Sequence, residues 1–298
     1  IIDKATNGRI YCGFNPMGTV TGRFSSQYPN LQQVPARDPE LGPMIRSLFI
    51  PEEDCEWVCA DYSQQEPRVL VHYASLKDMD TAIKVQDEFN KNEDTDFHQM
   101  VADMASIPRK QAKTINLGLF YGMGNKKLAA ELGLDSDQAY ELFNKYHDKV
   151  PFVKELSRQV SHVASTRGYI KTLLGRKRRF DMWEPRDSWG ERAYSLSEAH
   201  SQYPKQELKR AYTHTAMNAL IQGSSADITK SAMIKIYEAG LLDEIDLKLT
   251  VHDELDFSVE PLKQKCFDES LQIMKTCVDL KVPLKVDVEK GLNWGTIE

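Results

Sequence analysis

The chain has 298 residues and a formal net charge of −6, from 38 basic and 44 acidic residues. Its hydrophobic fraction of 41%, with 16 Gly and 13 Pro, excludes collagen-like, low-complexity and wholly disordered proteins. No stretch approaches the roughly 20 apolar residues that a membrane-spanning helix needs. The excess of acid argues weakly against a nucleic-acid partner, although basic residues cluster at 176–179 and 205–210.

The cysteines and the N-terminus indicate the cellular compartment. Five cysteines without a CxxC pair favour reduced thiols in the cytoplasm over disulfides or a zinc site. The start at Ile1 has no basic segment followed by an apolar one, so no secretory signal is expected. The missing initiator Met predicts a piece of a longer or processed protein.

The first two thirds of the chain predict one strand among loops and helices. Residues 1–35 are rich in turn-forming residues and predict loops with short strands. An apolar run at 57–60 predicts a strand that ends at Asp61, and the spacing over 64–76 predicts a helix. Residues 79–207 are expected to be largely helical.

The last third predicts a hairpin between helices. A long helix is expected over 205–240, followed by alternating strands at 247–251 and 255–259 that flank an acidic tip. A helix over 263–278 and a strand over 284–288 complete the chain. This order predicts an α+β fold, in which a helical lobe is inserted into an antiparallel sheet.

Two aspartates are candidates for a cation site. Asp61 ends a predicted strand and Asp253 lies at the hairpin tip, so both can meet at one edge of the sheet. Adjacent carboxylates repel each other, and a hard divalent cation such as Mg²⁺ removes that penalty. Two such ions can activate a hydroxyl and stabilise a leaving oxygen. Taken singly, each aspartate is better explained by a local backbone hydrogen bond, so neither alone indicates a cation site.

A helix from 109 onward presents cations and a ring on one face. Arg109, Lys113, Leu117 and Tyr121 are four residues apart and therefore share a side of the helix. Two cations suit a polyphosphate, and an aromatic ring suits stacking on a base. An ordinary amphipathic helix, with a solvated basic end and Tyr121 in a core, explains the pattern equally well.

A second helical stripe carries polar side chains. His214, Asn218 and Gln222 are also four apart, beside an apolar face. Such a stripe suits a helix that follows a nucleic-acid groove, and it also suits one that faces water.

Taken together, these motifs resemble those of the family A (DNA polymerase I-like) DNA polymerases. Asp61-Tyr-Ser-Gln-Gln-Glu66-Pro-Arg68 resembles motif A, Arg109-x3-Lys113-x7-Tyr121-Gly122 resembles motif B, and Val251-His252-Asp253-Glu254 resembles motif C. Other family elements occur in the expected order: Thr21-Gly22-Arg23, Pro29-Asn30-Leu31-Gln32, Gly175-Arg176, Asn218-x3-Gln222-Gly223 and Gly291-Leu-Asn293-Trp294.

The resemblance covers essentially the whole chain and implies a right-hand polymerase architecture. It implies palm at 1–78, fingers at 79–207 and palm again at 208–298, with thumb and exonuclease domains absent. A short segment between His98 and Arg109, with Gln65 and Pro67, gives the chain a phage-like character. The implied compartment is the cytoplasm, that of the host if a phage encodes the protein.

The resemblance also implies a reaction and its cofactor. A primer 3′-hydroxyl attacks a dNTP, and pyrophosphate leaves. Two Mg²⁺ ions, replaceable by Mn²⁺, are held by Asp61, Asp253 and the Tyr62 carbonyl, with Glu254 nearby. His98, Arg109 and Lys113 grip the triphosphate, and Lys113 also protonates pyrophosphate. The remaining nucleotide contacts implied are Leu117, Tyr121, Tyr62 and Glu66, of which Glu66 blocks a 2′-hydroxyl.

The implied partners are primer–template DNA, dNTPs and the protein's own thumb and exonuclease domains, with a monomer and no membrane expected. Arg23, Asn218 and Gln222 are expected to read minor-groove acceptors that all correct base pairs share. The further DNA contacts implied are Asn30, Gln32, Arg68, Gly122, His214 and His252.

Two residues depart from the family pattern, and two other functions remain open. Leu117 stands where most relatives carry Phe or Tyr, and His214 where many carry Arg. A single-subunit RNA polymerase shares the aspartates and the basic helix, but a ribonucleotide user needs a small residue in place of Glu66. A catalytically weak DNA-binding fragment is the third possibility.

Overall fold

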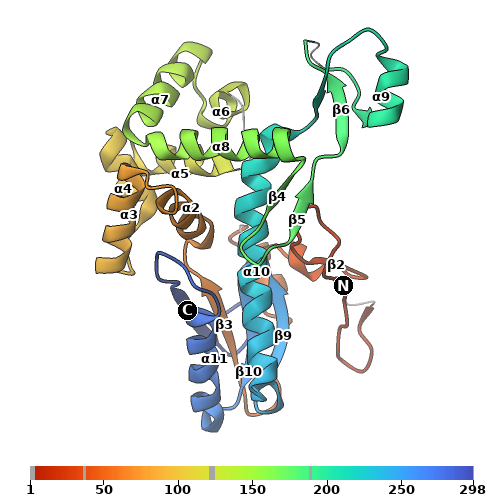
Figure 1. Cartoon of the computed structure of the whole chain (residues 1–298). Coiled ribbons are helices and arrows are strands. Elements are labelled where there is room, and N and C mark those ends of the chain that lie inside the picture. The colour runs from red at the N-terminus through yellow and green to blue at the C-terminus, as the bar shows by residue number, and fades with distance from the viewer. Residues whose placement is uncertain (1–3, 36–37, 121–124, 188–189, 298) are drawn as a thin grey trace. The chain divides into compact units, whose positions relative to one another are not determined.

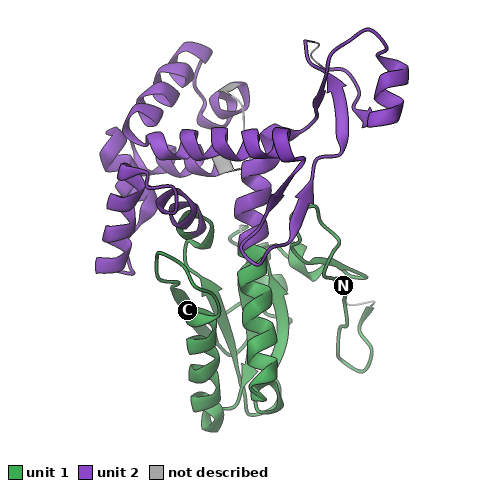
Figure 2. Cartoon of the chain, viewed as in Figure 1, with its two compact units in different colours: residues 1–68, 225–298 green, residues 69–224 purple. Residues whose placement is uncertain are grey.

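The computed structural model describes residues 4–35, 38–120, 125–187 and 190–297 (Figure 1). The chain folds into two compact units, unit 1 from 1–68 and 225–298 and unit 2 from 69–224 (Figure 2). The expected α+β class with an antiparallel sheet is confirmed. The predicted boundaries between palm and fingers, after residues 78 and 207, differ from the limits of these units and stay a prediction.

A four-stranded antiparallel sheet forms the centre of unit 1, in the order β11-β3-β10-β9. Its strands are β3 (Glu56–Tyr62), β9 (Asp246–Val251), β10 (Glu254–Val259) and β11 (Val286–Gly291). The alternation that predicted the hairpin holds, because β9 and β10 pair directly and turn at His252 and Asp253. The last strand starts two residues later than predicted.

One face of this sheet is covered by helices. Tyr62 points to this face, where its buried hydroxyl donates to the Met274 carbonyl at 2.9 Å. Phe257 meets Phe267 edge to face, with ring centroids 5.7 Å apart. Both contacts lead to α11 (Gln264–Thr276), which lies beside the C-terminal part of α10 (Ala216–Glu238) (Figure 1). Burial of these large rings stabilises the sheet that carries the site.

The opposite face is covered by the N-terminal segment and the C-terminal tryptophan. Trp57 of β3 stacks on Trp294, with centroids 6.0 Å apart, in a core with Leu31, Val34 and Leu249. The covering elements are β1 (Gly13–Asn15), β2 (Ser25–Gln27), η2 (Leu31–Gln33) and α1 (Leu41–Arg46). Along β3, Trp57 is buried whereas Asp61 is exposed, so this cover ends before the strand does.

Unit 2 begins within α2 and is mainly helical up to residue 167. The helices are α2 (Gln65–Ser75), α3 (Asp80–Lys91), α4 (Phe97–Ala105), α5 (Arg109–Phe120), α6 (Asn125–Leu132), α7 (Ser136–Lys149) and α8 (Pro151–Arg167). Two of these helices, α4 and α7, begin with a side-chain cap. Asp96 caps α4 by accepting from two backbone N–H groups, and Asp135 forms a capping box at α7.

The expectation of helix throughout 79–207 is wrong for its last part, and so is a helix start at 205. This region holds β4 (Tyr169–Lys171), β5 (Lys177–Arg179), β6 (Met182–Pro185), β7 (Tyr194–Ser195), α9 (Leu196–Gln202) and β8 (Leu208–Arg210). Gly168 ends α8 in the left-handed conformation, and Gly175 turns the chain between β4 and β5 with a positive φ. The Arg210 guanidinium covers the Trp183 ring at 4.5 Å and ties β8 to β6.

The remaining elements are short 3₁₀ turns: η3 (Thr213–Thr215), η4 (Leu241–Asp243) and η5 (Pro261–Lys263). Of the helices in the described part of the chain, none combines the length and the apolar character that crossing a membrane requires.

A buried histidine on α7 predicts acid sensitivity. Neither ring nitrogen of His147 has a hydrogen-bond partner among the described residues, and burial lowers the pKa of His147 to about 4. In the unfolded chain this ring has its ordinary pKa of 6.5, so between pH 6.5 and 4 the unfolded state binds the proton more readily than the folded state. Stability that is present above pH 6.5 is therefore lost as the pH falls toward 4. We expect His147→Leu to raise the free energy of unfolding by about 1–3 kcal/mol at neutral pH.

Thermal unfolding between pH 4 and 8 measures this effect. His147→Leu should flatten part of the acid loss, whereas His200→Leu, at an exposed site on α9, should not. An unchanged pH dependence in the His147 variant would show that this ring is not the source.

Candidate functional site

The two predicted aspartates meet at one end of the unit 1 sheet. In the register of β3 and β10, Asp61 lies opposite Glu254, and Glu254 directly follows Asp253 in the sequence. The Tyr62 N–H donates to the Asp253 carbonyl at 3.3 Å, which fixes the turn against the end of β3. His252 takes a positive φ of 60° in that turn. Strand pairing therefore brings together acids that are far apart in sequence.

The electrostatics at this end of the sheet are unfavourable without a cation. Desolvation first, and then the negative charges of Asp253 and Glu254, raise the pKa of Asp61 to about 8. Burial also raises the pKa of Asp253, although Arg23 opposes it. Hard divalent cations prefer oxygen ligands, and a bound cation would offset the repulsion between these crowded carboxylates. Asp61 and Asp253 are thus suited to hold Mg²⁺.

Tyr62 can contribute to this site only through its backbone. Its side chain is buried on the opposite face of the sheet, where the hydroxyl is bonded to Met274. The predicted role for its carbonyl therefore stays a prediction, and no role remains for its ring.

A second acidic group lies deeper in the same sheet face. The potential ligand atoms of Cys59, Glu254 and Asp256 are all within 4.8 Å of one another. Asp256 is fully buried and accepts from the Trp57 indole N–H at 2.9 Å. Burial raises the pKa of the Cys59 thiol, and a protonated thiol is a poor ligand for a hard cation. The solvent-reached Asp61 is the better candidate.

A buried ion pair lies beside the aspartates. Glu66, at the start of α2, is buried and accepts from an Arg23 guanidinium nitrogen at 2.5 Å. Its other carboxylate oxygen has no partner among the described residues. Burial first, and Asp253 in addition, raise the pKa of Glu66, while Arg23 lowers it. Glu66 is therefore held rigidly by Arg23, which was predicted to contact DNA.

The structure corrects one predicted DNA contact in unit 1. Arg68 is fully buried, where its guanidinium donates to the carbonyls of Ser63 at 2.9 Å and Pro283 at 2.7 Å. Arg68 thus holds the β3–α2 turn against the segment before β11, and it is wrong as a DNA contact because DNA has no access to it. The sequence motif alone does not reveal this burial.

The other predicted DNA contacts of unit 1 are on or near its surface. Asn30 is exposed and caps η2, accepting from the Gln32 N–H at 3.1 Å. Gln32 is half-buried and donates to the Thr250 carbonyl at 3.2 Å. His252 is exposed at the hairpin turn. These positions leave their DNA roles open.

The predicted triphosphate residues gather within unit 2. Arg109 begins α5 and donates to the Asp96 carboxylate, with its Nε 2.7 Å away. Lys113, one turn later, is exposed and forms no ion pair among the described residues. Both cations act electrostatically on buried His98, whose pKa is lowered to about 4 mainly by desolvation. Leu117 follows on α5 and is half-buried, whereas Tyr121 and Gly122 lie outside the described residues.

The expected stripe of three polar residues is only partly helical. Asn218 and Gln222 belong to α10, but His214 lies in the preceding 3₁₀ turn η3. Gln222 is buried, Asn218 is half-buried and His214 is exposed, so the three differ in access to solvent. The prediction that His214 belongs to this helix is therefore wrong, while the groove contacts of the three residues stay a prediction.

Three residues around His98 were missed by sequence reasoning. Asp96 caps α4 and holds Arg109, while Asn116 and Tyr146 form buried hydrogen bonds that reach His98. An aspartate directly before a helix is a recognisable capping signal. Nothing in the spacing of Asn116 and Tyr146 indicates that they meet.

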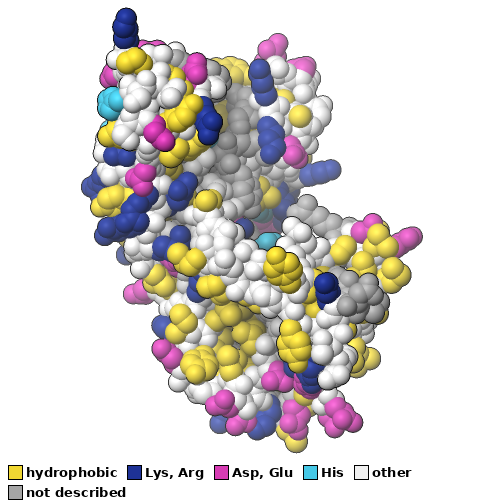
Figure 3. All heavy atoms as spheres, turned by 90° about the vertical axis from the view of Figure 1, so that its right-hand side faces the viewer, with side chains coloured by type: hydrophobic (Ala, Val, Ile, Leu, Met, Phe, Trp, Pro, Cys, Tyr) yellow, Lys and Arg dark blue, Asp and Glu magenta, His cyan; other side chains and the backbone are white. Residues whose placement is uncertain are grey.

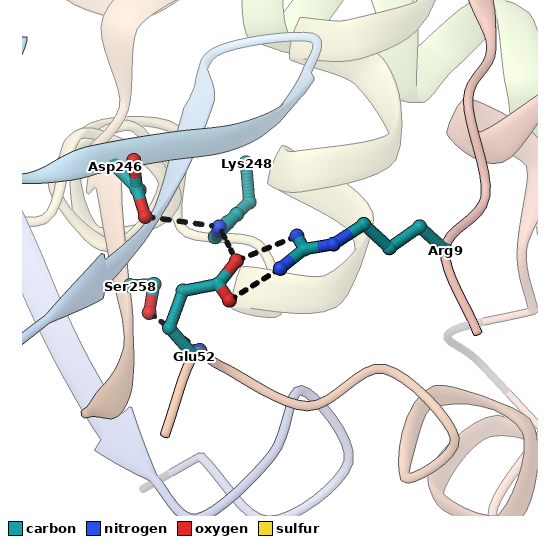
Figure 4. Close-up of polar contacts among 5 residues, drawn as sticks. All are labelled: Arg9, Glu52, Asp246, Lys248 and Ser258. Atoms are coloured by element: carbon teal, nitrogen blue, oxygen red, sulfur yellow. Dashed lines mark hydrogen bonds and ion pairs between the residues drawn. The ribbon is translucent and has the colours of Figure 1, made fainter. Parts of the chain in front are cut away.

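A hollow of about 630 Å³ lies elsewhere in unit 1. Its wall carries the charged cluster of Figure 4, in which Glu52 receives both terminal nitrogens of Arg9 at 2.7 and 2.6 Å and also pairs with Lys248. Asp246 pairs with Lys248 at 3.1 Å, and Ser258 accepts from the Glu52 N–H. These charges are already matched, and the pKa of Glu52 is lowered to about 2 by Arg9 and Lys248. The cluster fastens the N-terminal segment to β9.

Apolar side chains are exposed over the N-terminal part of unit 1. Figure 3 shows yellow side chains gathered on the part of the molecule that Figure 2 colours green. The large exposed side chains in this segment are Tyr11, Met17, Val20, Tyr28, Leu41, Met44, Leu48 and Ile50.

Comparisons with known proteins agree on one family. The model of DNA polymerase family A matches residues 1–296. The chain is 39% identical to a DNA-directed DNA polymerase of Pseudomonas phage M6, covering 98% of this chain and 48% of the relative. It is 35% identical to DNA polymerase I of Caldicellulosiruptor bescii, covering 97% of this chain and 32% of that protein.

A solved structure is also similar. The POL domain of Pol1 from M. smegmatis, in complex with DNA primer-template and dNTP, matches with a TM-score of 0.81 and 33% identity. The match covers 98% of this chain and 49% of that chain. The chain thus spans 32–49% of the length of these relatives.

Proposed function

Since the chain belongs to DNA polymerase family A, we propose that it carries the nucleotidyl-transfer centre of a template-directed DNA polymerase. The substrates are dNTPs and a primer–template duplex, and the product is a primer longer by one nucleotide with release of pyrophosphate. The observation that carries this proposal is the pairing of β3 with β10, which juxtaposes Asp61 and Asp253 with raised pKa values.

Each unit contributes residues of its own to the proposed reaction. In unit 1, Asp61 and Asp253 hold two Mg²⁺ ions, with the Tyr62 carbonyl as a further ligand. When bound, such ions activate the primer hydroxyl and stabilise charge on the departing oxygen. Glu254 stands directly opposite Asp61 and adds negative charge beside the ligands.

In unit 2, the cations of α5 bind the triphosphate. Arg109 and Lys113 are one helical turn apart, so both side chains project from the same side of α5 and can bind one triphosphate. Asp96 keeps the Arg109 side chain in place. Lys113, with its exposed ammonium, supplies a proton to pyrophosphate as it leaves.

The proposed partners follow from this chemistry. Primer–template DNA and dNTPs are the ligands, and the rest of a longer polymerase, with thumb and exonuclease domains, is the covalent partner. We place the protein in the cytoplasm as a monomer. Binding of DNA by this chain should depend strongly on salt, because phosphate contacts dominate such affinity.

Single-nucleotide primer extension at low ionic strength tests the proposed function. We expect this chain with Mg²⁺ to add the templated dNTP and to reject the matching rNTP. Preferential use of rNTPs would favour an RNA polymerase, and DNA binding without extension at any metal concentration would favour a DNA-binding fragment.

Sugar selectivity is expected to depend on Glu66. We expect Glu66→Ala to increase rNTP use relative to dNTP use by about ten- to a hundredfold, because the buried side chain held by Arg23 no longer excludes a 2′-hydroxyl. The ratio of kcat/KM values for dATP and ATP measures the change.

Glu66→Gln is the matched control, since it keeps the volume of the side chain and should retain most of the selectivity. Equal selectivity in wild type and Glu66→Ala would remove Glu66 from the sugar contact.

A further inference from the structure

A buried hydrogen-bond chain crosses three helices of unit 2. The Tyr146 hydroxyl of α7 donates to the Asn116 Oδ1 atom of α5 at 2.5 Å. The Asn116 Nδ2 atom lies 2.9 Å from the His98 Nδ1 atom of α4. Asn116 and Tyr146 are fully buried, and His98 nearly so. Buried polar groups cannot replace a protein partner with water, so each group in this series stays either a donor or an acceptor.

The order of donors in this chain sets the tautomer of His98. Because the phenol hydroxyl donates to Oδ1, the amide of Asn116 directs its NH₂ group at His98. That group can only donate, so Nδ1 must be the unprotonated acceptor. In a neutral imidazole the proton then resides on Nε2. Among the described residues, none forms a hydrogen bond with Nε2 of His98.

The charges around His98 keep the ring neutral. Desolvation lowers its pKa to about 4, Lys113 and Arg109 act in the same direction, and Asp96 opposes them. At neutral pH the ring therefore offers one N–H donor and carries no charge. It stands beside the two cations assigned to the triphosphate.

We propose that Asn116 and Tyr146 are positioning residues that hold His98 in the Nε2–H tautomer, so that its second nitrogen donates a hydrogen bond to a phosphate oxygen of a nucleoside triphosphate. The proposal deepens the proposed function and rests on it for the identity of the ligand. The hydrogen-bond chain itself rests only on the contacts within unit 2.

Nitrogen NMR of the intact chain reads the tautomer directly. In protein labelled with ¹⁵N-histidine, long-range ¹H–¹⁵N spectra distinguish protonated from bare ring nitrogens in all seven histidines. Loss of one set of signals in His98→Gln assigns His98. We expect a bare Nδ1 and a protonated Nε2 at pH 7.5. A protonated Nδ1 in the wild type would overturn the proposal.

Removing the terminal hydroxyl should release the tautomer. In Tyr146→Phe the Asn116 amide loses the donor that orients it, so we expect an Nδ1–H form of His98 to appear. The KM for dNTP should rise about tenfold, as for loss of one hydrogen bond to a charged group, with kcat changed less than about twofold. Tyr140→Phe, at an exposed site on the same helix, is the matched control and should change neither quantity.

Asn116→Asp provides a second, nearly isosteric variant in case Tyr146→Phe folds poorly. A carboxylate can only accept, so it should force the proton onto Nδ1 of His98. Unchanged tautomers in both variants would refute the positioning role. Spectra recorded without nucleotide test the series of hydrogen bonds, whether or not the protein extends primers.

Addition of dATP separates this inference from the proposed function. We expect the His98 Nε2 signal to shift in the wild type. A chain that extends primers but shows no such shift would overturn the contact between His98 and the triphosphate and leave the polymerase assignment standing. Failure to extend any primer, with the expected tautomer intact, would count against the proposed function instead.

Discussion

Replacing Asp61 or Asp253 with Asn is expected to reduce single-nucleotide incorporation by at least about 10³-fold. Each substitution removes one carboxylate from the pair that β3 and β10 bring together, and an amide oxygen is a weaker ligand for Mg²⁺. Affinity for primer–template should change little, because contacts to phosphates supply most of it. Rapid-quench measurements of one dATP addition, with a parallel DNA-binding titration, separate the two quantities.

Asp287→Asn is the matched control for these variants. Asp287 lies opposite Asp61 on the neighbouring strand β11, but its carboxylate pairs with Lys285 at 2.9 Å. Its pKa is lowered by Lys285 and Ser63, against desolvation, so it does not share the electrostatic strain of Asp61. We expect incorporation within about threefold of wild type. Losses of similar size in all three variants would point to damage of the sheet.

The second large effect is expected at Lys113. Replacing Lys113 with Ala should lower kcat for nucleotide addition by about 10²–10³-fold and raise the KM for dNTP, because the variant loses a phosphate contact and a proton donor together. The side chain is exposed on α5, so its loss should not disturb folding. Single-turnover kinetics over a range of dNTP concentrations measure both constants.

Two variants define what Lys113 contributes. Lys113→Arg keeps a cation and should recover much of the affinity for dNTP but less of kcat, since a guanidinium is a poor proton donor. Lys110→Ala removes an exposed cation from the same helix and should have little effect. Equal losses for Lys110→Ala and Lys113→Ala would indicate a general electrostatic role for the helix and contradict a specific one.

Part of the arrangement at the end of the unit 1 sheet is predictable from the sequence. The alternation in β9 and β10 has a period of two, which indicates a hairpin directly, and the turn places Asp253 at its tip. Asp61 follows a short apolar strand, so both acids were expected at strand ends. The pairing of β3 with β10 joins segments far apart in the sequence, and the chemistry of the two aspartates allows this pairing without requiring it.

Burial and long-range hydrogen bonds were beyond sequence reasoning. The motif predicts that Arg68 is a surface cation, yet its guanidinium is buried and donates to two backbone carbonyls. Arg23 reads as a DNA contact, yet it pairs with Glu66. Both outcomes depend on which segments pack together, and the spacing of charges along one segment carries no information on that.

The strands between 169 and 210 show a second limit. They are two to four residues long, too short for any periodicity to develop, and glycine conformations set their boundaries. Arg210 fixes β8 through the face of Trp183, a contact between residues far apart in this segment. The sequence pattern therefore predicts helix across this region, as on either side of it.

Binding of Mn²⁺ to the chain, followed by electron paramagnetic resonance without DNA and with competing Mg²⁺, is the most direct measurement of whether the acids at the ends of β3 and β10 form a cation site. The structure predicts that the wild type and Asp287→Asn bind Mn²⁺ with similar affinity, that Mg²⁺ displaces it, and that Asp61→Asn and Asp253→Asn each weaken binding at least about tenfold. Undiminished Mn²⁺ binding in both of those variants would contradict it.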